Sequence, residues 1–119
     1  MRVRSVLPAL ALIVGSFPVV TAQDALKTDP AHYKVMSENE RVRIVHVHYG
    51  PHEKSIMHAH PDAVVVSLSG GKTMFHLADG KTEVVELKPG DAMFTPKTVH
   101  LPENVSDKPM DAVLIELKK

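Results

Sequence analysis

Turn-forming dipeptides recur every 9 to 11 residues along much of the chain, at Gly50-Pro51, Pro61-Asp62, Gly70-Gly71, Asp79-Gly80 and Pro89-Gly90. Glycine adopts backbone angles that other residues avoid, and proline ends a helix or a central strand. A helix of ordinary length does not fit between such breaks, whereas a strand of about five or six residues does. The spacing therefore predicts an all-β fold of many short strands, either a sandwich or a barrel.

The segments between the breaks are rich in β-branched residues and hold no capped helical period, which is typical of strands. The predicted strands are Arg41–Tyr49, Ile56–His60, Ala63–Ser69, Thr73–Leu77, Lys81–Leu87, Ala92–Thr95 and Met110–Leu117. The stretch from Pro96 to Pro102 is predicted to be irregular. An edge strand is predicted around Tyr33–Met36, within an otherwise polar arm.

The first 22 residues have the layout of a secretory signal peptide. Arg2 and Arg4 give a positive start, an apolar run follows from Val6 to Val20, and a small residue stands at Ala22. The run is short and is interrupted by prolines and a glycine, which favours cleavage near Ala22 over a membrane anchor. We therefore expect a signal peptide (1–22), an N-terminal arm (23–40) and one barrel domain (41–119), in a periplasmic or secreted protein without stable membrane insertion.

Charge and cysteine content exclude several classes of function. Removing residues 1–22 leaves 12 of the 14 basic residues against all 14 acidic ones, so no basic surface for nucleic acid is expected. The chain has no cysteine, which excludes disulfides and thiolate metal ligands. It has eight histidines, and all of them follow residue 22.

Three of these histidines suggest a metal site. Side chains two residues apart on a strand point to the same face, so His58 and His60 would project together. His100 follows a Gly-Asp turn and a proline-bounded loop, and a barrel could bring it opposite the pair. The alternative is that all three are polar cavity residues, hydrogen-bonded to one another or to water.

At the level of motifs, the chain resembles the cupin superfamily. The segment from Gly50 to Gly71, with its His-x-His pair, is similar to the first cupin motif, and Gly90 to Pro96, followed by His100 and Asn104, is similar to the second. The resemblance implies a small antiparallel jelly-roll barrel in which His58, His60 and His100 match three of four metal ligands. It also implies a homodimer.

The fourth ligand of the family, a glutamate, falls on Val64, which cannot bind a metal. Asp62 is a weaker substitute, because it shares the face of His58 and His60 only if Pro61 does not break the strand. Three imidazoles leave coordination positions open for water or substrate. A divalent ion is expected there, whether iron, zinc, manganese, copper or nickel, and the ligand set also resembles that of thiol dioxygenases.

Two kinds of function remain open. The first is a small metalloenzyme acting on an organic molecule by oxygen activation or Lewis-acid chemistry. The second is a non-catalytic cupin that binds a small ligand, with or without metal. His52, in the loop before the pair, is a candidate general acid or base. Tyr49 is a candidate catalytic residue under a third hypothesis, in which the protein is a sugar isomerase or epimerase.

Overall fold

The computed structural model describes residues 23–119, and almost all of their regular structure is β-strand. The predicted signal peptide lies outside the described residues. A single helical turn, α1 (Ala25–Thr28), precedes the strands. These are β1 (Tyr33–Glu38), β2 (Val42–Tyr49), β3 (His58–His60), β4 (Ala63–Ser67), β5 (Gly71–Leu77), β6 (Thr82–Leu87), β7 (Ala92–Thr95), β8 (Thr98–Asn104) and β9 (Met110–Leu117).

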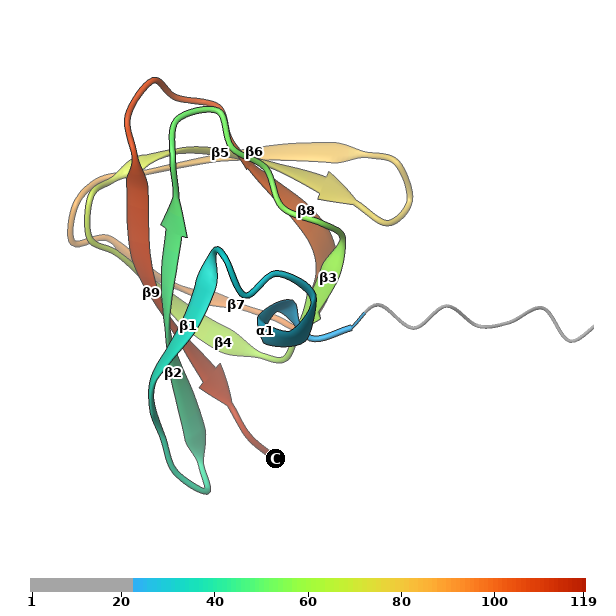
Figure 1. Ribbon diagram of the computed structural model, residues 1–119, viewed down its shortest axis with the longest axis vertical. Coiled ribbons are helices and arrows are strands. Elements are labelled where there is room, and N and C mark those ends of the chain that lie inside the picture. Colours follow the sequence, from blue (N-terminus) through green and yellow to red (C-terminus); the bar gives the residue numbers. More distant parts are fainter. Residues whose placement is uncertain (1–22) are drawn as a thin grey trace, which may run out of the picture.

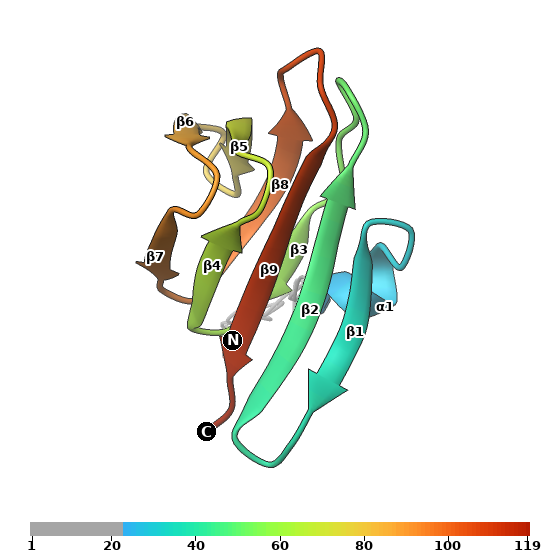
Figure 2. The same cartoon turned by 90° about the vertical axis from the view of Figure 1, so that its left-hand side faces the viewer.

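The strands form two antiparallel sheets that face each other (Figure 1). The five-stranded sheet has the order β1-β2-β9-β4-β7, and the four-stranded sheet has the order β3-β8-β5-β6. In the view of Figure 2, the first sheet crosses the front of the molecule, and β3 and β8 lie behind it. The chain passes back and forth between the sheets, which encloses an interior lined by both.

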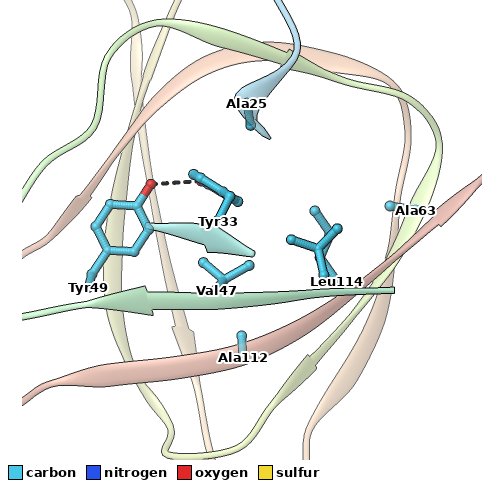
Figure 3. Close-up of a cluster of buried hydrophobic side chains, with 8 residues drawn as sticks. Ala25, Tyr33, Val47, Tyr49, Ala63, Ala112 and Leu114 are labelled. Carbon is cyan, nitrogen blue, oxygen red and sulfur yellow. Dashed lines mark hydrogen bonds between the residues drawn. The ribbon is translucent and has the colours of Figure 1, made fainter. Parts of the chain in front are cut away.

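The core lies between the sheets, where alternate side chains of β2 and β9 point inward (Figure 3). Val45, Val47 and Tyr49 come from β2, and Ala112 and Leu114 come from β9. This alternation follows from the period of two in a strand. Ala25 of α1 and Tyr33 of β1 belong to the same buried cluster, so residues before the predicted barrel complete its core.

The predictions for the strands between turn signals are confirmed, with ends that differ by a few residues. The Asp79-Gly80 turn joins β5 to β6, and Gly80 has a φ of 86°, in the left-handed region that favours glycine. The prediction that Pro96–Pro102 is irregular is wrong, because Thr98–Asn104 form β8. Pro102 is tolerated in this strand because β3 pairs only with Thr98–His100, so β8 has one long partner, β5, beyond that point.

Among residues 23–119, no helix has the length and apolarity of a membrane span.

Candidate metal centre

Three histidines meet where β3 and β8 pair. The register places His58 of β3 directly opposite His100 of β8, and His60 lies two residues along β3 on the same face as His58. One ring nitrogen of each histidine lies within 4.8 Å of one ring nitrogen of each of the others. The predicted convergence of the three imidazoles is therefore confirmed.

The outer nitrogens of the paired histidines are already engaged. His58 Nδ1 lies 2.8 Å from the carbonyl oxygen of Ile56, to which it donates. His60 Nδ1 lies 3.1 Å from Oε2 of Glu116, which assigns it the proton as well. With Nδ1 engaged in this way, Nε2 is the nitrogen that each ring of the pair can offer to a metal ion.

His100 provides the test of whether a metal ion fits. Its Nε2 is buried and has no hydrogen-bond partner among the described residues. Burying a polar atom without a partner costs free energy, so such an atom calls for an explanation. Burial, and then the neighbouring His60, lower the pKa of His58 to about 4 and that of His100 to about 3. Both rings are therefore neutral near pH 7, the form that binds a metal. The three donors fit a divalent transition-metal ion.

Among the described residues, no carboxylate joins the three histidines in place of the missing glutamate. Val64 lies on β4 between β7 and β9 and brings no ligand. Asp62 does not join the histidines, because its Oδ1 accepts from the backbone N–H of Lys97 at 2.8 Å. The carboxylate of Glu116, which is 2% exposed, contacts Nδ1 of His60 and is not a member of the three-histidine cluster.

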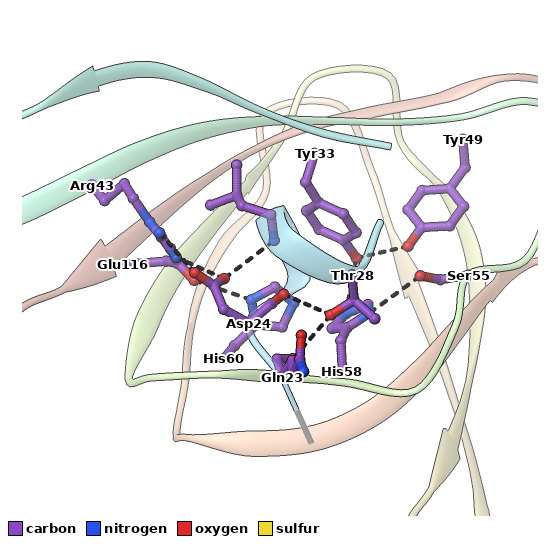
Figure 4. Close-up of polar contacts among 11 residues, drawn as sticks. Gln23, Asp24, Thr28, Tyr33, Arg43, Tyr49, Ser55, His58, His60 and Glu116 are labelled. Carbon is purple, nitrogen blue, oxygen red and sulfur yellow. Dashed lines mark hydrogen bonds and ion pairs between the residues drawn. The ribbon is translucent and has the colours of Figure 1, made fainter. Parts of the chain in front are cut away.

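Glu116 could have been found in the sequence. It shares strand parity with Ala112 and Leu114, which marks it as a charged residue on an inward face. A buried carboxylate needs a partner, and Arg43 of β2 provides it, donating from Nε to Glu116 Oε1 at 2.6 Å (Figure 4). Arg43 and Glu116 are directly opposite each other in the β2–β9 register.

Two tyrosines extend the polar site. The Tyr33 hydroxyl lies 3.2 Å from His58 Nε2 and 2.7 Å from the Tyr49 hydroxyl. Burial raises the pKa of both phenols far above their ordinary value, so both hold their protons at neutral pH. Tyr49, a candidate from the sequence, is thus beside the histidines. Tyr33 was not anticipated there, because it was placed in an arm outside the barrel.

A cavity of about 370 Å³ adjoins the cluster. His60, His100, Tyr33 and Tyr49 supply part of its wall, and most of the remaining lining is apolar. The apolar lining includes Val65, Phe75, Leu87, Met93, Phe94 and Leu114. Glu83 and Lys97 are the charged side chains in the lining apart from the histidines. Such a space suits a small, mainly apolar organic molecule with one polar group.

The remaining histidines lie elsewhere. His52 is on an exposed loop with a φ of 58°, its Nε2 lies 2.6 Å from Asp107, and it does not line the cavity. His46 and His48 point out of the five-stranded sheet, where each contacts Asp111 at 2.9 Å.

The comparisons with known proteins agree with this geometry. The family model described as a cupin domain matches residues 45–116. Among solved structures, a cupin domain from Bordetella pertussis is 29% identical, with a TM-score of 0.68 over 73% of this chain and 92% of that one. A protein with a double-stranded β-helix domain from Klebsiella pneumoniae is 26% identical, with a TM-score of 0.58 over 71% of this chain and 74% of that one.

A polyketide cyclase from Streptomyces resistomycificus shares the fold at 19% identity, with a TM-score of 0.55 over 73% of this chain and 64% of that one. Among curated proteins, none matches the chain in sequence.

Proposed function

Because the chain belongs to the cupin family, we propose that it is a metal-dependent enzyme in which His58, His60 and His100 hold a divalent ion beside a cavity for a small organic substrate. The observation that carries this proposal is the buried Nε2 of His100, which has no hydrogen-bond partner among the described residues although the ring belongs to a cluster of three histidines with ring nitrogens within 4.8 Å of one another. When bound, a divalent ion would supply Lewis acidity or, if it is redox-active, oxygen chemistry. A fold alone does not fix activity, so the site has to support the argument.

The protein's own groups would bind and orient the substrate. The Tyr33 hydroxyl is protonated and lies beside His58, so it can donate a hydrogen bond to an oxygen atom held between the histidines. Its second contact, to Tyr49, fixes the phenol in place. The apolar wall would exclude water around the rest of the substrate, which strengthens electrostatic contacts inside the site.

The cavity also favours a class of substrate. Its volume of about 370 Å³ falls at the lower end of the range for small-molecule pockets. Phe75 lies against His100, with ring centroids 4.9 Å apart and planes 23° from parallel, so the lining next to that ligand is aromatic. We propose a small apolar or aromatic molecule that carries a single metal-binding oxygen function.

The location of the enzyme rests on residues 1–22, whose sequence favours export and cleavage near Ala22. Amino-terminal sequencing of protein recovered from a bacterial periplasm tests this directly. A mature chain that begins at or near Gln23 supports export, and an intact amino terminus in the cytoplasm contradicts it.

Metal analysis tests the central proposal. Protein purified from the compartment it reaches naturally should carry close to one divalent ion per chain, and His58→Ala and His100→Ala should lose it. His52→Ala, on an exposed loop, is the matched control and should retain it. If the wild type and the ligand variants hold the same trace of metal, the proposal is wrong. A metal-loaded protein that binds but never converts small molecules would instead identify a binding protein.

A further inference from the structure

One side of the histidine cluster is built from residues that precede the family match. The carbonyl oxygen of Gln23 accepts from the backbone N–H of Ala59 at 2.9 Å, and Asp24 forms a parallel β-bridge with the same residue. The segment therefore pairs with β3, which carries the histidine pair. α1 follows at once, and its Ala25 is 1% exposed in the core. We call Gln23–Asp29 the N-terminal plug.

The plug contacts His60 through a chain of charged groups (Figure 4). The two carboxylate oxygens of Asp24 accept from Nη1 and Nη2 of Arg43, each at 2.9 Å. Arg43 Nε donates to Oε1 of Glu116 at 2.6 Å, and Oε2 of Glu116 lies 3.1 Å from Nδ1 of His60. Asp24 is therefore three contacts away from a candidate metal ligand.

Asp24 determines how Arg43 contacts Glu116. A guanidinium group can bind a carboxylate in a bidentate manner, with two parallel N–H groups. Asp24 accepts from both terminal nitrogens of Arg43, while Nε and Nη2 of Arg43 reach Glu116 at Oε1 alone. Oε2 is thereby left for His60. Without Asp24, the arginine is free to turn and engage both oxygens of Glu116, in competition with the histidine.

The other end of the plug contacts His58 by a separate route. Asp29 Oδ2 accepts from the hydroxyl of Ser55 at 2.5 Å, and Ser55 Oγ lies 3.2 Å from Nδ1 of His58. The His58 ring has a second hydrogen-bond partner on this side, since the carbonyl oxygen of Ile56 also accepts from its Nδ1. The two acidic residues that flank α1 therefore each reach one histidine of the His58–His60 pair, and Asp29 contacts His32 as well.

We infer that Asp24 and Asp29 are positioning residues of the metal centre, each holding one histidine of the pair with its Nε2 toward the middle of the cluster. As a statement about metal binding, this inference rests on the proposed function. As a statement about how the imidazoles are held, it applies to the metal-free protein as well. Because His58 has an additional acceptor, loss of Asp24 has the larger effect.

The histidine tautomers are measured by side-chain ¹⁵N nuclear magnetic resonance. The sample is the full, naturally processed chain, from which a chelator has removed any metal. The wild type should show His58 and His60 protonated on Nδ1. Asp24→Asn keeps an acceptor for the helix cap but removes the charge and one oxygen. It should give His60 a mixture of tautomers and leave His58 unchanged. Asp29→Ala should disturb His58 but not His60, to a smaller extent, and it also removes the Asp29 contact of His32.

Ser55→Ala provides a second variant for the His58 route, in case Asp29→Ala does not fold. Glu38→Gln is the matched control, since it breaks an ion pair with Lys118 that touches neither histidine. A folded Asp24→Asn protein with an unaltered His60 tautomer would overturn the inference, as would equal changes at both histidines, which indicate a general loosening of the fold.

Competition with a chelator for Zn²⁺ then separates this inference from the proposed function. Asp24→Asn should bind Zn²⁺ roughly 10-fold more weakly, within the range for loss of a group that orients a metal ligand. If the wild type binds no divalent ion while the tautomers respond as expected, the proposed function fails and the positioning roles stand. If the wild type binds Zn²⁺ and Asp24→Asn changes neither the Zn²⁺ affinity nor the His60 tautomer, the proposed function stands and the positioning role of Asp24 fails.

Discussion

The two sides of the sandwich differ in how their polar and apolar groups are arranged. On the β3 side, charged groups are linked from the partly buried Asp24 through Arg43 to the buried Glu116, and Asp24 pairs with the edge strand β3 just before α1. On the opposite side, β6 and β7 are the outer strands of their sheets. There the cavity lining includes Met93 and Phe94, which are 41% and 57% exposed.

This difference separates two tasks. The β3 side holds imidazoles in fixed orientations, which requires dense hydrogen bonding and exclusion of water. The β6–β7 side exposes apolar side chains where the cavity reaches the surface, which suits the entry of a small apolar molecule. A change on the first side should therefore affect stability and metal binding, and a change on the second should affect the ligand.

Glu116→Ala should give the largest loss of stability. It leaves the partly buried Arg43 with one carboxylate and leaves Nδ1 of His60 without its acceptor. Removing one partner of a buried ion pair costs about 3–5 kcal/mol. Urea unfolding of the metal-free protein measures the loss, with Glu86→Ala on the exposed β6 as the control. A loss no larger than that of the control would show that the β3 side is not the rigid one.

Leu114→Ala and Phe94→Ala compare the two sides by their apolar side chains. Leu114 is 6% exposed in the core, so its truncation should cost about 2–5 kcal/mol. Phe94 is mostly exposed, and its truncation should cost less than about 0.5 kcal/mol while weakening uptake of an apolar fluorescent probe. Equal losses of unfolding free energy in the two variants would contradict the comparison.

Tyr33→Phe should have an intermediate effect. It removes the hydroxyl that contacts both Tyr49 and His58 but keeps the ring in the core. The expected loss of stability is about 1 kcal/mol, the ordinary contribution of one hydrogen bond. Thermal unfolding measures it. An unchanged melting temperature together with unchanged visible spectra of the Co²⁺-loaded protein would exclude a role for this hydroxyl.

The smallest expected effect concerns pH. Burial acts to lower the pKa of His32, but hydrogen bonds to Glu53 and Asp29 outweigh it and leave the pKa above its ordinary value of 6.5. Protonated His32 therefore stabilises the fold at pH values below 6.5, and this contribution is lost as the pH rises through the raised pKa. The difference in unfolding free energy between the wild type and His32→Gln should shrink between about pH 6 and about pH 8. A difference that stays constant or grows would contradict this assignment.

The strands and the histidine cluster could be predicted because their signals are local. Turn dipeptides bracket each strand, and the spacing of His58 and His60 fixes their common face. The strand that holds His100 was missed because Pro96 precedes it and Pro102 lies within it, and whether a strand tolerates proline depends on which neighbours pair with it.

The support around the cluster could not be predicted in the same way. Arg43 and Glu116 are 73 residues apart in sequence and meet only because β2 and β9 pair in one particular register. A shift of one residue in this pairing would place the two side chains on opposite faces of the sheet and separate them. Asp24 and Tyr33 were assigned to an arm, since nothing in a polar segment states which buried group it will contact.

The bond between Gln23 and Ala59 has a consequence for comparing relatives of this protein. An alignment restricted to residues 45–116 keeps all three histidines but omits Asp24, Asp29, Tyr33 and Arg43. Two homologues could therefore look equivalent across the matched region and still differ in how firmly their imidazoles are oriented. An acid that caps the helical turn before the first strand, an arginine early in the second strand and a glutamate late in the last would identify those that share this arrangement.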